Sequence, residues 1–177
     1  MNILQEAITF MQKFIILLTK EEFKYIENPD FECFILSENL SADFKKNFAL
    51  KAKDKIVLAQ NLKDMTDFNL DGVVLDFSMV QNISFEWKKI KPQVSGKITG
   101  LITRNRRHEA MLTSECEPDF IIFKAWCDGI DKIKELTSWY QEMFLIQSAL
   151  WPQEDFDAKD FETDFLIISD TKYKKSA

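Results

Sequence analysis

The chain has 177 residues, of which 46% are hydrophobic and 29% are charged. These fractions are those of a globular protein, and they exclude a disordered, collagen-like or low-complexity chain. The formal net charge of -6 argues against a dedicated nucleic-acid-binding protein, because such proteins neutralise phosphates with a basic face.

The chain opens with Asn2–Met11, whose apolar residues are spaced as on one face of a helix. This pattern predicts an N-terminal helix that covers one end of the fold. Short apolar segments then alternate with helical patterns. The predicted strands are Phe14–Thr19, Phe31–Ser37, Lys55–Gln60, Gly72–Phe77, Ile98–Ile102, Asp119–Lys124, Met143–Ser148 and Asp164–Ser169. The predicted helices between them are Lys20–Glu27, Ser41–Leu50, Leu62–Phe68, Phe85–Ile90, Asn105–Cys116 and Ile130–Tyr140.

Several local signals set the predicted ends of these helices. Ser41 and Asn105 are of residue types that cap helix N-termini, so we expect each to begin a helix. Pro118 blocks continuation of the helix that starts at Asn105. The tail TKYKKSA, which follows the last strand, is too short and too basic to form a final helix.

Eight strands that alternate with helices predict a parallel sheet, and eight is the number that closes a barrel. We therefore predict an α/β fold: a compact (β/α)8 TIM-type barrel with an N-terminal helix and a shortened or missing final helix. Residues 1–177 are expected to form one domain, because no Gly/Ser-rich or Pro-rich linker interrupts the alternation. The alternative is an open doubly wound sheet with fewer strands.

The cysteines and the apolar runs indicate the compartment. Cys33, Cys116 and Cys127 are odd in number and lack the close spacing of a disulfide framework or a zinc site, which favours a reducing cytoplasm. The longest apolar run, Phe14–Leu18, is far below the roughly 20 residues that span a bilayer. Met1–Lys13 lacks the features of a signal peptide. We expect a cytoplasmic protein without a membrane partner.

The stretch Ile98–Lys124 carries a family resemblance. The sequence RRHEAM, Arg106–Met111, followed by EPDFIIFK, Glu117–Lys124, resembles a divergent branch of the thiamine-phosphate synthase family. In that branch an Arg-His-Asp-Ala-Met helix precedes a Gly-Ala-Asp-Tyr strand. LTSWYQEMFLI, Leu136–Ile146, is similar to the Trp-rich sixth helix and seventh strand of that branch, so the resemblance extends to about a third of the chain.

The resemblance implies an enzyme that joins a hydroxymethylpyrimidine diphosphate to a thiazole phosphate in thiamine biosynthesis. It also implies Mg2+ as cofactor and a phosphorylated small molecule as substrate. Typical members carry an Arg and a Lys after the second strand and a His in the fourth, whereas this chain has Ser37, Glu38 and Val74 there. Asn61 partly matches the Asn-Asp pair of the family, and Asp76 matches the acidic metal ligand only in a shifted register.

In a barrel of this type the functional residues follow the strands on the C-terminal face. The candidate phosphate site there consists of Arg104, Arg107 and His108, where cations coincide with a helix N-terminus. The alternative is that these residues are solvated or pair with Glu109 and Glu115. Only 4 glycines occur in the chain, which disfavours a phosphate-cradling loop, because glycine lets backbone approach a phosphate closely.

Two functional hypotheses follow. The first is a thiamine-phosphate synthase with a degenerate active site, because most of the family's catalytic motifs are missing and no catalytic residue can be assigned. The second is a non-catalytic barrel that serves as a small-anion-binding or protein-interaction module. The sequence does not indicate the oligomeric state.

Overall fold

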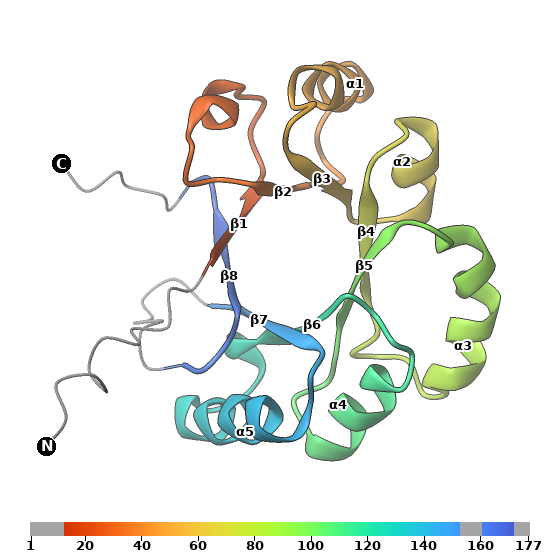
Figure 1. The fold of residues 1–177 in the computed structure, drawn as a ribbon, viewed down its shortest axis with the longest axis vertical. Coiled ribbons are helices and arrows are strands. Elements are labelled where there is room, and N and C mark those ends of the chain that lie inside the picture. The colour runs from red at the N-terminus through yellow and green to blue at the C-terminus, as the bar shows by residue number, and fades with distance from the viewer. Residues whose placement is uncertain (1–12, 153–160, 172–177) are drawn as a thin grey trace, which may run out of the picture.

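The eight predicted strands form a closed barrel. The computed structural model describes residues 13–152 and 161–171. In these ranges the strands pair in parallel in chain order, and β8 pairs with β1 (Figure 1). The strands are β1 Lys13–Leu18, β2 Cys33–Leu36, β3 Ile56–Ala59, β4 Gly72–Asp76, β5 Ile98–Ile102, β6 Phe120–Lys124, β7 Gln147–Trp151 and β8 Phe165–Ser169. The predicted TIM-type barrel is confirmed, and the open doubly wound sheet is excluded.

Helices surround much of this barrel. Figure 1 shows the α-helices of the described ranges outside the strands, from α1 at the top through α3 on the right to α5 at the bottom. They are α1 Ala42–Lys51, α2 Leu62–Asp67, α3 Ile83–Ile90, α4 Arg107–Ser114 and α5 Ile130–Met143. Short 3₁₀ helices are η1 Lys24–Glu27, η2 Lys91–Val94 and η3 Ala125–Cys127. No helix in the described ranges is long and apolar enough to cross a membrane.

The strands are buried on both faces, which explains their continuous apolar sequences. Alternate residues point into the barrel, where they form a cluster of Ile15, Leu17, Ile35, Leu58, Val74, Ile102, Phe120, Ile122, Ala149 and Ile167. The residues between them pack outward against the helices in two further clusters. The inward positions therefore follow a period of two along each strand, and this period also predicts which residues reach the barrel mouth.

Three aspartates join neighbouring strands at the N-terminal end of the barrel. Asp71, Asp119 and Asp164 each directly precede an even-numbered strand. Their Oδ2 atoms accept the backbone N–H of Val57, Thr99 and Ser148, at 2.8, 2.7 and 2.9 Å respectively. The backbone N–H of each aspartate in turn donates to the carbonyl of the same partner. Each carboxylate thus fixes one strand against the next.

The prediction of the seventh strand as Met143–Ser148 is wrong, because the strand is Gln147–Trp151. Helix α5 continues to Met143, and the ring of Phe144 then stacks on Tyr140 with centroids 4.7 Å apart. Met143 therefore ends the helix, and Phe144 and Ile146 pack against the cluster that contains the buried residues of α5. The strand begins where the chain enters the barrel wall.

The start of α4 also differs from the prediction. Arg106, not Asn105, is the N-cap, and its side chain makes no capping hydrogen bond. The side chain of Asn105 turns away from the helix, and its Nδ2 donates to the carbonyl of Lys124 at 2.7 Å. Ser41 caps α1 as expected. The segment Lys20–Glu27 is helical only in the 3₁₀ turn η1.

The remaining predictions concern residues outside the described ranges. The N-terminal helix, Asn2–Met11, lies in residues 1–12, and the expected absence of a final helix concerns residues 172–177.

Candidate functional site

The barrel mouth carries a polar layer whose members follow from the inward period of two. Each member lies two residues after an interior position of its strand. Asp76, Arg104, Lys124 and Trp151 thus follow the interior residues Val74, Ile102, Ile122 and Ala149 respectively. These residues come from the C-terminal ends of β4 to β7, the face on which barrel proteins bind their ligands. The candidate site is therefore located over these four strands.

An ion pair crosses this layer. The Nζ atom of Lys124 lies 2.7 Å from Oδ2 of Asp76. The other carboxylate oxygen of Asp76 accepts hydrogen bonds from the backbone N–H of Ser78 at 2.9 Å and from its hydroxyl at 2.6 Å. Burial acts to raise the pKa of Asp76, but the hydrogen bonds from Lys124 and Ser78 outweigh it, so the pKa lies below the ordinary value. Asp76 is therefore an anion at neutral pH, with both oxygens engaged.

Two tryptophans flank the lysine of this pair. Lys124 Nζ lies 5.5 Å from the ring centroid of Trp126 and 5.8 Å from that of Trp151, and the two rings meet edge to face at 5.5 Å. Both distances are within the range of cation–π attraction. Lys124 is thus held from three sides, by Asp76 and by the two tryptophans.

Beside this ion pair lies a cavity of about 250 Å³. Its lining comprises Ser78, Met79, Thr103, Arg104, Asn105, Arg106, Lys124 and Asp128. Arg104 is positioned by its Nε, which donates to the carbonyl of Ser78 at 3.0 Å. Arg104 and Arg106 share one carboxylate, Glu109, at the long distances of 3.7 and 3.9 Å. Asp128 also lines the cavity, and its pKa is lowered by the hydrogen bond from Lys132 and, to a smaller extent, by the charge of Arg106.

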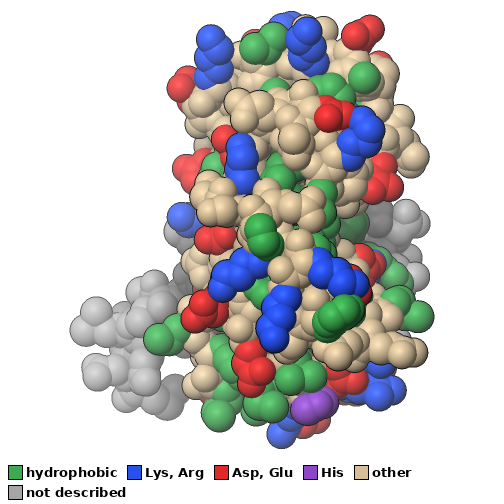
Figure 2. All heavy atoms as spheres, turned by 90° about the vertical axis from the view of Figure 1, so that its right-hand side faces the viewer, with side chains coloured by type: hydrophobic (Ala, Val, Ile, Leu, Met, Phe, Trp, Pro, Cys, Tyr) green, Lys and Arg blue, Asp and Glu red, His purple; other side chains and the backbone are tan. Residues whose placement is uncertain are grey.

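Of the predicted phosphate-binding residues, only Arg104 lines this cavity. Arg107 instead pairs with Glu135 of α5 at 2.6 Å and lies over the ring of Trp139 at 5.3 Å. His108 is exposed in the first turn of α4. The face over α2, α3 and α4 mixes Lys and Arg with Asp and Glu side chains, without an extended region of one charge (Figure 2).

Asn61 lies at the other side of the mouth, after β3. Its Oδ1 caps α2 by accepting from the backbone N–H of Asp64 at 2.7 Å, and its Nδ2 donates to Oε1 of Glu38 at 3.1 Å. Lys45 Nζ pairs with Asp64 at 2.7 Å and donates to the carbonyl of Glu38 at 2.9 Å. The polar groups after β2 and β3 thus bond to each other.

The backbone N–H groups that follow β1 already donate hydrogen bonds within the protein. The carboxylate of Asp170 accepts the backbone N–H of Thr19 and of Lys20, each at 2.9 Å, and the Thr19 hydroxyl at 2.6 Å. An internal carboxylate therefore takes the backbone donors that could otherwise hold a ligand anion at this end of β1. The acidic segment after β7, with Glu154, Asp155 and Asp157, lies outside the described residues.

The donor set does not fit a magnesium ion. Magnesium prefers several oxygen ligands in an octahedral arrangement, whereas both oxygens of Asp76 already accept bonds from Lys124 and Ser78. The described part of the chain contains no group of three or more His, Cys, Asp or Glu residues able to hold a metal. Cys33 and Cys116 offer no alternative nucleophile, because burial raises the pKa of Cys33 to about 12 and that of Cys116 to about 11.

Sequence reasoning did not find the Lys124–Asp76 pair, Ser78 or the two tryptophans. The signal that could have found the pair is the period of two from the strand interiors. Ser78, Trp126 and the contacts of Arg106 depend on loops, whose conformation the period does not predict.

No protein-family model matches the chain, and no curated protein matches it in sequence. Solved structures with the same fold do match. Thiamine phosphate pyrophosphorylase from Pyrococcus furiosus superimposes with a TM-score of 0.65 at 12% identity, over 91% of this chain and 86% of that one. Orotidine 5'-monophosphate decarboxylase from Sulfolobus solfataricus gives 0.60 at 7% identity, over 93% and 91%. KGPDC from Streptococcus mutans gives 0.59 at 10% identity, over 90% and 88%. At these identities the likeness concerns the fold alone.

Proposed function

We propose that this barrel binds a small phosphorylated molecule in the cavity over the ends of β4, β5 and β6, and that it does so without the thiamine-phosphate synthase reaction. The observation that carries the proposal is the pair Arg104 and Arg106, which share a single distant carboxylate at the rim of this cavity. Guanidinium groups bind phosphate through two parallel hydrogen bonds, which suits this position.

The charge balance around the cavity favours an anion. The ion pairs at its rim include one more cation than carboxylates. The cations are Arg104, Arg106, Lys124 and Lys132, and the carboxylates are Asp76, Glu109 and Asp128. The N-terminus of α4 adds to the attraction, because its first N–H groups carry partial positive charge and Arg106 provides no side-chain cap. A phosphomonoester would neutralise the excess charge.

Two of the structural neighbours are named for phosphorylated compounds, thiamine phosphate and orotidine 5'-monophosphate. This supports a phosphorylated ligand for the present chain by analogy of fold only. The synthase reaction is the less favoured candidate. It would need a magnesium-diphosphate site, whereas Glu38 after β2 is bonded to Asn61 and Asp76 at the end of β4 is bonded to Lys124.

The test is the thermal stability of the purified chain with inorganic phosphate. A ligand that binds only the folded state at 100 times its Kd stabilises by about 2.7 kcal/mol. For a chain of this length we expect a rise in Tm of roughly 5–10 °C. Arg104→Ala combined with Arg106→Ala should abolish the rise. Arg107→Ala is the matched control and should retain it, because Arg107 pairs with Glu135 of α5.

A direct assay for thiamine phosphate, with both substrates and magnesium, tests the other half of the proposal. We expect no turnover, and robust turnover would contradict the proposal that the barrel is a binding protein. An equal response to phosphate in the double Arg variant and in the wild type would mean that the anion binds elsewhere. For the compartment we keep the cytoplasm as a proposal, supported by the free thiols of Cys33 and Cys116.

A further inference from the structure

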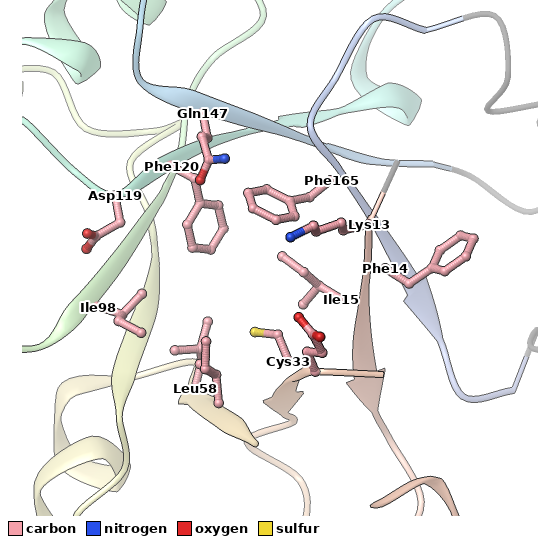
Figure 3. A pocket seen from close by; sticks show the side chains of 12 residues that line it. Lys13, Phe14, Ile15, Cys33, Leu58, Ile98, Asp119, Phe120, Gln147 and Phe165 are labelled. Carbon is pink, nitrogen blue, oxygen red and sulfur yellow. The ribbon is translucent and has the colours of Figure 1, made fainter. Parts of the chain in front are cut away.

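A second cavity lies at the opposite, N-terminal end of the barrel. It has a volume of about 310 Å³ and is formed by the first residues of the strands. Figure 3 shows the rings of Phe120 and Phe165 and the side chains of Ile15 and Leu58 directed into it. The interior residues Ile35, Ile122 and Ile167 have no exposed surface and lie between this cavity and the barrel mouth. The two cavities are therefore separate.

The walls of this cavity are apolar, and their shape depends on a close contact. A Cβ atom on Gly100 would lie 2.5 Å from the ring of Phe120, so glycine at this position allows the ring to lie inside the barrel. Phe120 meets Phe165 edge to face, with centroids 5.9 Å apart. Two aromatic rings and several aliphatic side chains thus line a space near the lower end of the range of small-molecule pockets, about 300–1,000 Å³.

Charged and amide groups stand around this apolar space. Lys13 and Glu32 both line the cavity, and Figure 3 shows the amine of Lys13 directed toward its centre. Neither side chain forms an ion pair or a hydrogen bond with another described residue, and neither does the amide of Gln147. Asp119 is turned away in Figure 3 and is bound to Thr99. The rim therefore offers one free cation, one free anion and one free amide among the described residues.

Lys13 and Glu32 come from neighbouring strand starts. Ile15 is in register with Cys33, so Glu32 lies one residue away from the position on β2 that is opposite Lys13. Opposite charges that line one cavity without an ion pair between them suit a ligand that carries both charges. A ligand with a lone carboxylate would be repelled by Glu32, and a lone amine would be repelled by Lys13.

From this arrangement we infer that the N-terminal cavity binds a small zwitterion with an apolar side chain, such as an apolar α-amino acid. The side chain of the ligand occupies the space among Ile15, Leu58, Phe120 and Phe165. Its carboxylate pairs with Lys13 and its ammonium group with Glu32. This site is distinct from the proposed phosphate site, and neither proposal depends on the other.

Calorimetric titration of the complete chain with three probes tests this inference. The probes are phenylalanine, 3-phenylpropionate, which lacks the ammonium group, and 2-phenylethylamine, which lacks the carboxylate. Exposed ion pairs are worth up to about 1 kcal/mol, a factor of roughly five in affinity. Phenylalanine should therefore bind about fivefold more tightly than either analogue.

Two variants test which charged residue of the cavity pairs with which charged group of the ligand. In Lys13→Gln the preference for phenylalanine over 2-phenylethylamine should vanish, and in Glu32→Gln the preference over 3-phenylpropionate should vanish. Both positions are exposed, so both variants should fold. Lys88→Gln, on the exposed surface of α3, is the matched control and should bind as the wild type does. Ile98→Trp should fill the cavity and abolish binding of all three probes.

The inference is overturned if phenylalanine does not bind the complete chain, because the cavity is then filled or closed. It is overturned equally if the three probes bind with the same affinity, or if Lys13→Gln and Glu32→Gln leave their preferences unchanged.

Discussion

The three carboxylates that join neighbouring strands make a quantitative prediction about stability, and Asp119 is the clearest case. Its Oδ2 accepts the backbone N–H of Thr99 at 2.7 Å and the Thr99 hydroxyl at 3.3 Å. Thr99 is 5% exposed, so Asp119→Ala leaves a buried N–H without an acceptor. Such a loss costs about 1–3 kcal/mol. For a chain of this size the cost corresponds to a fall in Tm of roughly 2–12 °C. Asp119→Asn keeps an acceptor oxygen and should lose less than half as much.

Urea unfolding followed by circular dichroism measures this effect, since the transition midpoint moves with stability while the slope stays constant. Asp71→Ala should behave in the same way, because Asp71 accepts the N–H of Val57 at 2.8 Å. Glu117→Ala, next to the same strand but exposed and without a side-chain partner among the described residues, is the control. If Asp119→Ala proves as stable as Asp119→Asn, the carboxylate does not hold the strands together, and the reasoning fails.

Two further predictions concern ion pairs. The side chains of Lys45 and Asp64 are only 6% and 15% exposed. Lys45→Met leaves the buried carboxylate of Asp64 without its partner and should lower the free energy of unfolding in urea by about 3–5 kcal/mol. The control is Lys63→Met, at an exposed ion pair, which should lower it by less than about 1 kcal/mol. If Lys45→Met lowers the free energy of unfolding by less than Lys63→Met does, the Lys45–Asp64 pair is not a buried ion pair that stabilises the fold. Lys124→Gln should raise the pKa of Asp76 in an NMR titration of its carboxyl carbon, because Lys124 provides a hydrogen bond that lowers it. The pKa of Asp76 is lower in the folded state, so the stabilisation by Lys124 is present above the unfolded value of about 3.9 and is lost as the pH falls through the folded pKa. The wild type should therefore lose more stability in acid than Lys124→Gln does. Equal losses would mean that the Lys124–Asp76 pair is not maintained in solution.

The barrel itself could be predicted because its signal is local. Each strand is buried on both faces and reads as a short apolar run, so β5 was predicted with its observed bounds, Ile98–Ile102. The prediction of β7 failed because Phe144 and Ile146 are apolar for a different reason. They pack against α5 in the cluster outside the barrel. An apolar run alone does not distinguish a strand from residues that cover the end of a helix.

The candidate site could be predicted only in part. The presence of Arg104 at a strand end follows from the strand bounds. The Lys124–Asp76 pair joins residues 48 positions apart in the sequence and requires both the barrel closure and the inward period of two. The prediction that Asn105 caps α4 failed because the carbonyl of Lys124 takes its side-chain amide. A tertiary partner there outweighed a local preference.

The position of Lys124 limits what the barrel mouth can hold. At the end of β6 its side chain crosses the barrel mouth to Asp76, and the tryptophans on either side keep it there. The space that remains beside it is about 250 Å³, which suits a ligand smaller than the drug-sized molecules that occupy pockets of about 300–1,000 Å³. A condensation of two substrates would need both to fit over the same strand ends. Opening that space would require separating an ion pair whose carboxylate is also fixed by Ser78. One small anion beside Arg104 requires no such change, which is why the geometry favours binding over synthesis.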